Sequence, residues 1–176
     1  MDIWKFFSIT HREHAVCNPL SDEKLARLVG LLRLPAEARV VDIACGKGEF
    51  LIRLAEAYGI RGTGVDISPF FIADAERRLQ ERARGAEVVF RQMDGADFRP
   101  EEPHTLAVAS CIGASWVFGG HEATLDALSG MVEPGVVGVD KIKHRGESGV
   151  GRVGAARGGG KIKYASPLRI DDANPD

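Results

Sequence analysis

Apolar positions along the chain follow two different periods, one typical of buried strands and one typical of helices with a single buried face. Four short, β-branched runs are predicted strands: residues 39–44, 61–68, 87–93 and 106–112. Four stretches with apolar residues three or four positions apart are predicted helices: residues 21–34, 48–59, 69–84 and 121–133. Strands that alternate with helices at this spacing predict a doubly wound α/β fold around a parallel sheet.

This pattern occupies only the middle of the chain. The opening up to Pro19 is irregular, so residues 1–37 are read as a leader followed by a capping helix, and residues 38–142 as the α/β domain. After Pro134 the periodicity stops, apart from a possible fifth strand in "VVGVDKI". Glycine then rises to 9 residues in 135–160, against 12 in residues 1–134. We expect the Gly-rich, basic tail at 143–176 to be disordered, because it cannot bury an apolar face.

Composition excludes several classes of protein. The formal net charge of −2 favours neither a nucleic-acid nor a membrane partner, although residues 136–176 carry 8 basic against 5 acidic side chains. No apolar run approaches the roughly 18 residues of a membrane span. The three cysteines lack metal-ligand spacing, so no metal site is predicted. Reduced thiols without a secretory signal predict a cytoplasmic protein.

The loop after the first predicted strand, "VVDIACGKGEF" (40–50), limits the ligand. A triphosphate loop requires a hydroxyl residue after its lysine, and here Gly48 follows Lys47. A dinucleotide loop requires a third glycine, and Leu51 occupies that position. Asp42 lies within the strand, where it would repel a pyrophosphate but attract an ammonium group. Asp66 ends the second strand and suits the ribose of either ligand class.

Taken with "GTGVDIS", "QMDGADF" and "LAVASCIGASWVFGG", this loop resembles the class I S-adenosylmethionine-dependent methyltransferases. The resemblance covers about residues 38–135, and the leader is similar to one bacterial, small-molecule-type branch of the family. It implies a Rossmann-like sheet, S-adenosyl-L-methionine as cofactor and methyl transfer as activity. The positions that match the family's cofactor site are Asp42, Ala44, Cys45, Gly46, Gly48, Asp66, Ile67, Asp94, Gly95 and Cys111.

The resemblance assigns a role to each of these positions. The loop from Asp42 to Gly48 wraps the methionine part of the cofactor, and Asp66 binds both ribose hydroxyls. Ile67 packs against the adenine. Asp94, with Gly95 beside it, accepts a hydrogen bond from the adenine amino group. The segment after strand four, from Cys111 to Ala114, lies beside the sulfonium. Ala44 replaces the usual glycine of the family, which is expected to be a small change.

Structural roles remain open for several of these residues. Asp42 is weighed against a carboxylate that simply satisfies nearby backbone amides, Asp66 against a surface carboxylate at a strand end, and Asp94 equally against ordinary turn chemistry. Cys45 and Cys111 are expected to be packing residues rather than nucleophiles. Lys47 is expected to be solvated.

For the reaction, methyl transfer mainly requires alignment, and a general base only where the acceptor must lose a proton. The catalytic group is unknown; His121 is the candidate after strand four, and His11 and His14 are expected to line a lid. A base-methylating signature of the N-P-P-Y type is missing, which favours a small-molecule acceptor over nucleic acid. The alternatives are an NAD-binding oxidoreductase-like domain and a non-catalytic cofactor-binding protein.

The resemblance stops abruptly near Val136. In the family a fifth strand, a last helix and an antiparallel hairpin follow this point. The shift to Gly, Arg, Lys and Ala predicts a truncated or frameshifted end, with the C-terminal strands of the methyltransferase fold missing or replaced. Such a chain is expected to have an exposed sheet edge beside strand four, and impaired activity.

Overall fold

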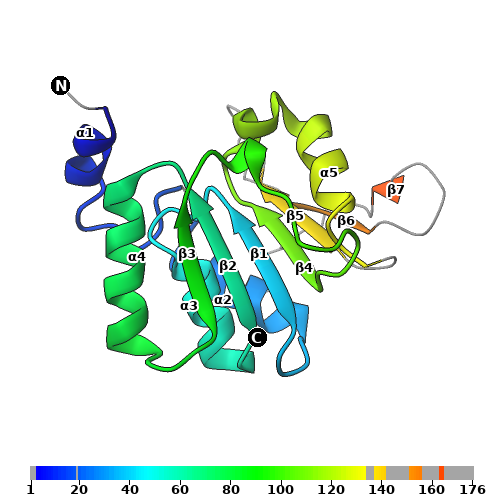
Figure 1. Cartoon of the computed structure of the whole chain (residues 1–176), viewed down its shortest axis with the longest axis horizontal. Coiled ribbons are helices and arrows are strands. Elements are labelled where there is room, and N and C mark those ends of the chain that lie inside the picture. Colours follow the sequence, from blue (N-terminus) through cyan, green and yellow to red (C-terminus); the bar gives the residue numbers. More distant parts are fainter. Residues whose placement is uncertain (1–2, 19, 134–136, 142–150, 156–162, 165–176) are drawn as a thin grey trace, which may run out of the picture.

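The computed structural model describes residues 3–18, 20–133, 137–141, 151–155 and 163–164. Within these residues seven strands form one sheet in the order β3-β2-β1-β4-β5-β6-β7 (Figure 1). The strands are β1 (Arg39–Ile43), β2 (Arg61–Asp66), β3 (Val88–Gln92), β4 (Val108–Cys111), β5 (Val137–Lys141), β6 (Gly151–Ala155) and β7 (Lys163–Tyr164). The helices are α1 (Ile3–Thr10), α2 (Asp22–Leu32), α3 (Glu49–Tyr58), α4 (Pro69–Arg82) and α5 (His121–Ser129), with short 3-10 turns η1 (Gly95–Asp97) and η2 (Ser115–Phe118).

The first five strands run parallel, which confirms the predicted doubly wound α/β fold. β1 lies between β2 and β4, with Val40 opposite Gly62 on one side and Val108 on the other. The order therefore reverses at β1, because the chain first builds outward to β3 and then crosses to β4. In such sheets ligands bind at the carboxyl ends of the strands, beside the point of reversal.

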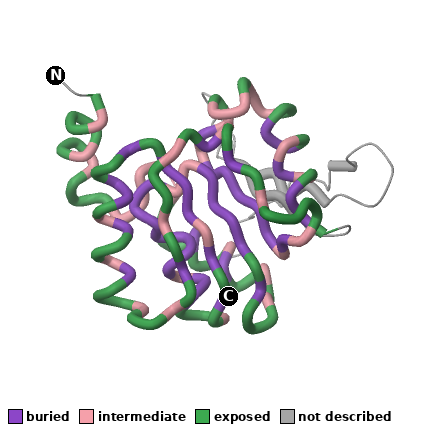
Figure 2. Tube along the Cα trace, in the orientation of Figure 1, coloured by how far each residue is buried: buried purple, intermediate pink, exposed green. Residues whose placement is uncertain are grey.

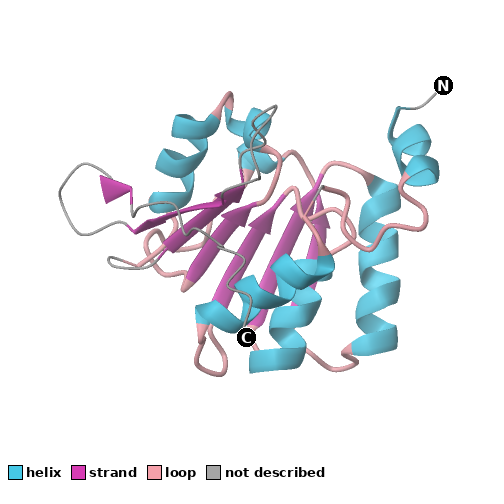
Figure 3. Ribbon diagram, turned by 180° about the vertical axis from the view of Figure 1, so that it is seen from behind, coloured by secondary structure: helices cyan, strands magenta, loops and turns pink. Residues whose placement is uncertain are grey.

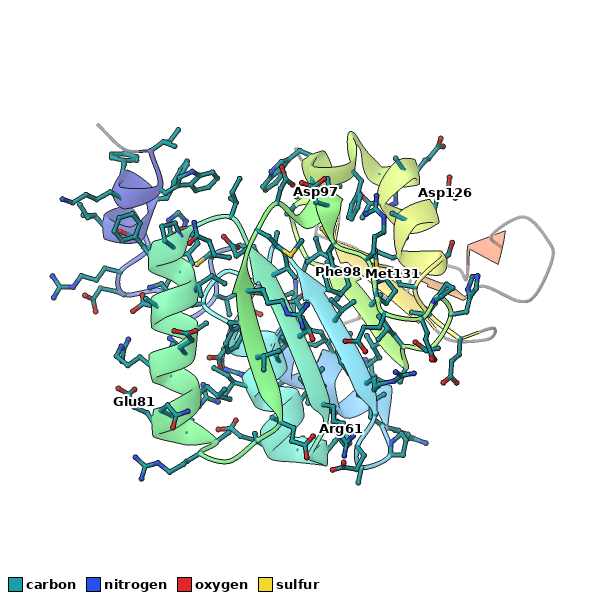
Figure 4. All side chains as sticks on the ribbon, viewed as in Figure 1. Arg61, Glu81, Asp97, Phe98, Asp126 and Met131 are labelled. Carbon is teal, nitrogen blue, oxygen red and sulfur yellow. The ribbon has the colours of Figure 1, made fainter. Side chains whose placement is uncertain are left out.

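Helices cover both faces of the sheet (Figures 1 and 3). α2, α3 and α4 pack on one face around a core that includes Val40, Leu51 and Leu79. α5 packs on the other face, where Phe98 and Met131 lie together with Val41 (Figure 4). Because successive strand residues point to opposite faces, Val40 and Val41 contribute to different cores. Both cores lie along the central strands β1 and β4, in which every residue except Arg39 at the start of β1 is buried (Figure 2).

Local signals in the sequence explain where the helices begin and end. The Ser21 side chain accepts a hydrogen bond from the Lys24 amide at the start of α2. α4 begins with Pro69 directly after Ser68, whose hydroxyl accepts from the Phe71 amide. Gly59 ends α3 in the left-handed conformation. These boundaries lie within two residues of the predicted ones, except that α5 ends four residues early.

The leader differs from its predicted irregular form. α1 occupies Ile3–Thr10, and none of these eight residues is buried. Five of its eight residues are apolar and cover a broad face opposite Lys5 and Ser8, and the segment is too short for a period to stand out in the sequence; Ile3, Phe6 and Ile9 are exposed. α1 lies beside α4, above the carboxyl end of the sheet (Figure 1).

The C-terminal part also differs from expectation. The predicted sheet edge beside strand four is wrong, because β5 pairs in parallel with β4 and covers it. β6 then pairs antiparallel with β5, and β7 antiparallel with β6. Two segments of the tail that was expected to be disordered, Gly151–Ala155 and Lys163–Tyr164, are therefore strands. The other positions of the tail prediction lie outside the described residues.

Candidate functional site

A cavity of about 540 Å³ lies at the carboxyl ends of β1 to β4. The loops after these four strands form its floor, and residues of the leader form a wall. Eight of the predicted cofactor residues line it: Asp42, Ala44, Cys45, Gly46, Asp66, Ile67, Asp94 and Gly95. Gly48, Cys111 and the catalytic candidate His121 are not among its lining residues. The topology therefore brings together most of the residues that the sequence singled out, from three separate segments.

Asp42 is an almost fully buried acid at the end of β1, with 4% of its surface exposed. The Ser110 hydroxyl on the neighbouring strand β4 donates to its Oδ1 at 2.6 Å. Burial raises the pKa of Asp42 to about 7; the Ser110 hydrogen bond opposes this rise, and the charge of Asp66 adds to it. A cation bound in the cavity would favour the ionised form, as an acid that recognises an ammonium group requires.

Asp66 joins the loops after β1 and β2. Its Oδ2 accepts from the Gly46 amide and its Oδ1 from the Ser68 amide, both at 2.9 Å. Burial raises the pKa of Asp66 even though the amides of Ser68, Gly46 and Ile67 stabilise its charge. A carboxylate offers about four lone-pair directions, so these two bonds leave capacity for a hydroxyl of a ligand.

The loop between these acids adopts left-handed backbone at three alternate positions. The φ angles are 56° at Ala44, 54° at Gly46 and 72° at Gly48. A side-chain carbon at Gly48 would lie 2.5 Å from the Phe90 ring, which explains the glycine there. Gly48 thus shapes the loop without lining the cavity. At Ala44 the left-handed conformation costs about 1–2 kcal/mol, so its departure from glycine is a larger change than the sequence indicated.

Asp94 and Gly95 follow β3. Asp94 caps η1, since its Oδ1 accepts from the Ala96 amide at 2.9 Å, and it also lines the cavity. Both readings of this residue, turn chemistry and ligand contact, are thus compatible with its position. Gly95 packs closely on the sheet, where a side-chain carbon would lie 2.5 Å from Ile43.

The thiols of the site are held in their neutral form. Burial raises the pKa of Cys45 well above its usual value, and burial likewise raises that of Cys17. Both side chains therefore carry neutral thiols at neutral pH. Cys111 is fully buried in the core beneath α5, while the next three residues, Ile112 to Ala114, line the cavity.

Sequence reasoning missed the burial of two charged residues beside the glycine loop. Lys47 was expected to be solvated, yet only 3% of its surface is exposed, because its ammonium binds backbone carbonyls of the leader. Glu49 is 4% exposed and pairs with Arg53, Arg78 and Arg82. The one available signal was the i,i+4 spacing of Glu49 and Arg53; the remaining contacts join segments that are distant in the sequence.

Comparison with known proteins agrees with this geometry. Residues 40–135 match a family described as a methyltransferase domain. The chain is 38% identical over 135 residues to the uncharacterized protein YjhP of Escherichia coli, covering 77% of this chain and 54% of that protein. Over half of the chain matches the family, and the chain therefore belongs to this family of methyltransferase domains.

Solved structures show the same relationship. An S-adenosylmethionine-dependent methyltransferase from Thiobacillus denitrificans, in complex with S-adenosylhomocysteine, is 40% identical with a TM-score of 0.74, over 81% of this chain and 56% of that one. A second, from Geobacter sulfurreducens and in complex with the same ligand, is 35% identical with a TM-score of 0.73, over 78% and 55%. The chain thus spans about half the length of the relatives it matches. No described helix is long and apolar enough to cross a membrane.

Proposed function

We propose that the chain binds S-adenosyl-L-methionine in the cavity at the carboxyl end of its sheet and transfers the methyl group to a small-molecule acceptor. The observation that carries this proposal is the pair Asp42 and Asp66, two buried acids that end adjacent parallel strands on either side of a left-handed glycine loop. The S-adenosylhomocysteine bound by the two solved relatives supports it. Nothing in the comparisons favours an NAD-dependent oxidoreductase.

The residues present fit this cofactor. Asp42 would hold the ammonium group, because its raised pKa shows a buried carboxyl without a compensating cation. Asp66 would accept the ribose hydroxyls with its remaining lone pairs, and Asp94 the adenine amino group. Ile67 lines the cavity with 42% of its surface exposed, as a residue that covers an adenine face would. When bound, S-adenosylmethionine supplies an electrophilic methyl group on a sulfonium.

The protein's own part in the reaction is alignment and exclusion of water. Ile112, Gly113 and Ala114 line the cavity after β4, where the acceptor would meet the methyl group. Of the four histidines in the described residues, His11 lines the cavity and His121 does not. An acceptor that must lose a proton would therefore have His11, rather than His121, within the same cavity.

The nature of the acceptor and the location of the protein belong to the proposal as well. The cavity walls are mostly apolar and include Trp4, Phe7 and Trp116, which suits an organic small molecule better than a nucleic-acid backbone. None of the three cysteines is in a disulfide, which supports a reducing, cytoplasmic environment. The division into a leader, a cofactor domain and a basic tail is likewise part of the proposal.

Calorimetric titration with S-adenosylhomocysteine tests the cofactor assignment. Wild-type chain is expected to bind with micromolar affinity, and Asp66→Ala to bind at least tenfold more weakly. Asp126→Ala is the matched control, because Asp126 is an exposed residue on the outer side of α5, away from the cavity (Figure 4). A folded wild-type chain that releases no heat, or equal binding by all three proteins, would refute the assignment.

A further inference from the structure

The ammonium group of Lys47 is buried and has three acceptors. Nζ donates to the carbonyl oxygens of His11 at 2.7 Å and Arg12 at 3.1 Å, and it lies 3.5 Å from Asp74 Oδ2 on α4. An ammonium group has three donors, and here it has two hydrogen bonds to carbonyls and one ion pair with a carboxylate. A buried charge persists only where it is paired in this way. The environment of Lys47 is therefore built around its charge.

Two of these three acceptors belong to the leader, here residues 3–18. They follow the last turn of α1, where free carbonyl groups carry the negative end of the helix dipole and favour a cation. Because none of the residues of α1 is buried, apolar packing contributes little to holding the helix in place. His11 also lies edge-on to Phe71 of α4, with ring centroids 6.4 Å apart. Lys47 is thus a polar anchor of the leader on this side of the cavity.

A second anchor lies on the opposite side. The Asn18 side chain donates to the Ile112 carbonyl after β4 at 3.2 Å, and it accepts from the Leu20 amide. Seven residues of the leader, on and between these anchors and in α1, line the cavity: Trp4, Phe7, His11, Ala15, Val16, Cys17 and Asn18. A ligand in the cavity therefore has the glycine loop on one side and the leader on another.

The backbone of Lys47 belongs to the loop that would hold the ligand. Gly46 and Gly48 flank it in left-handed conformations, and the Gly46 amide is bound by Asp66. A ligand that fixes this loop also fixes the backbone from which the Lys47 side chain extends. The ammonium group is then held in place to bind the leader carbonyls. Without the leader, the ammonium would keep only Asp74 and would have to be hydrated.

We infer that Lys47 is a positioning residue that couples occupancy of the cavity to docking of the leader. The inference rests on the proposed function, since the ligand concerned is the cofactor or its product. Coupling between two such events is reciprocal. The factor by which the ligand raises the equilibrium constant for leader docking equals the factor by which the docked leader raises the affinity for the ligand. We expect a factor of about ten, within the usual range of such couplings.

Amide hydrogen exchange on the wild-type chain tests the inference without any substitution. Saturating S-adenosylhomocysteine is expected to slow exchange at residues 7–13 about tenfold. The turn at residues 83–87, at the far end of the sheet from the cavity, is the internal control and should not respond. Bound ligand with unchanged exchange in the leader would overturn the coupling.

Lys47→Met then separates this coupling from general stability. It keeps the length of the side chain but removes the charge; Lys5→Met makes the same change at an exposed site on α1. Lys47→Met is expected to bind S-adenosylhomocysteine about tenfold more weakly and to show fast leader exchange with or without ligand, while Lys5→Met behaves as wild type. Wild-type affinity together with ligand-dependent leader protection in Lys47→Met would refute the role of Lys47.

The two proposals fail in different ways. Loss of binding in the wild-type chain would refute the proposed function, and the coupling with it. Binding by the wild-type chain without a response in the leader would refute the coupling alone. Should Lys47→Met fail to fold, as circular dichroism would show, the exchange experiment on the wild-type chain still decides.

Discussion

Ser110 and Asp42 face each other across the two central strands of the sheet. The Ser110 Oγ donates to Asp42 Oδ1 at 2.6 Å and lies 3.1 Å from the Val41 carbonyl, and both side chains are buried. This single hydroxyl only partly offsets the burial of the acid, whose pKa is raised to about 7. The protein thus keeps a carboxyl group that is costly to ionise at the point where a cationic group of a ligand would bind.

Asp42→Asn is expected to stabilise the ligand-free protein at high pH and to abolish binding of S-adenosylhomocysteine. The folded protein holds the Asp42 proton up to about pH 7, whereas the unfolded chain releases it near its ordinary value of 3.8. Raising the pH therefore favours unfolding of the wild-type chain, and asparagine removes this effect. Between pH 5 and pH 8 the wild type should lose about 3 kcal/mol relative to the variant.

Urea unfolding at the two pH values, with calorimetry for the ligand, measures both effects. Asp126→Asn serves as control, because Asp126 is exposed and its substitution should change neither quantity. A difference between wild type and Asp42→Asn that does not grow with pH would show that the pKa of Asp42 is not raised in the folded protein.

Ala44→Gly is expected to stabilise the protein by about 0.5–1 kcal/mol. Ala44 has a φ of 56°, and glycine adopts this conformation without the steric cost that alanine incurs, although glycine loses more entropy on folding. Ala26→Gly, at an exposed position within α2, should destabilise by about 1 kcal/mol. Opposite signs in urea unfolding would support the left-handed assignment, and equal signs would contradict it.

The sequence predicted the parallel strands and most of the helices because their apolar periods are strong and their caps are local. It also predicted which loops meet, since the carboxyl ends of parallel strands share one edge. It could not predict α1, because eight residues with a broad apolar face are too few to show a helical period. Nor could it reveal the burial of Lys47, which depends on carbonyls 35 and 36 residues away.

The conformation of Ala44 was hidden for a different reason. Left-handed backbone is usually marked by glycine, and here the marker itself is replaced. The predicted truncation or frameshift near Val136 stays a prediction. Reading the coding DNA in its other two frames tests it: an apolar strand followed by a helical pattern in either frame would support it, and the lack of both would refute it.

Gly48→Ala is expected to destabilise the protein by about 2 kcal/mol more than Gly59→Ala. Both glycines are left-handed, with φ angles of 72° and 62°, so each substitution carries a similar backbone cost. At Gly48 the added carbon would also lie 2.5 Å from the Phe90 ring and 3.0 Å from the Ala75 side chain, whereas nothing lies within 4 Å at Gly59. The difference therefore measures overpacking beneath the glycine loop.

Urea unfolding of the two variants provides this comparison, and calorimetry adds a functional one. Gly48→Ala should weaken S-adenosylhomocysteine binding because it moves the loop, while Gly59→Ala, at the far end of α3, should leave binding unchanged. Equal losses of stability in the two variants would mean that Phe90 moves aside freely.

Glu49→Gln is expected to destabilise the protein by roughly 2–4 kcal/mol, because it leaves three arginines around a neutral, buried amide. Glu49 Oε1 lies 2.6 Å from Arg53 Nε, and Oε2 lies 2.7 Å from Arg82 Nη1. Burial alone would raise the pKa of Glu49, but hydrogen bonds from Arg82 and Arg53 outweigh it and hold that pKa below its usual value. The stabilisation is therefore present above the unfolded value of 4.5 and is lost as the pH falls through the folded value.

The exposed pair of Arg77 and Glu81 is the matched control, since both side chains are 57% exposed and the same substitution, Glu81→Gln, should cost at most about 0.5 kcal/mol. Urea unfolding at pH 7 and pH 4 measures both variants. The difference between wild type and Glu49→Gln should shrink at the lower pH, because protonation of Glu49 then weakens the wild type. Similar small losses in both variants would show that Glu49 acts as an ordinary surface acid. A large loss at Glu49 alone would identify it as the group that fixes the start of α3, directly after the loop proposed to bind the cofactor.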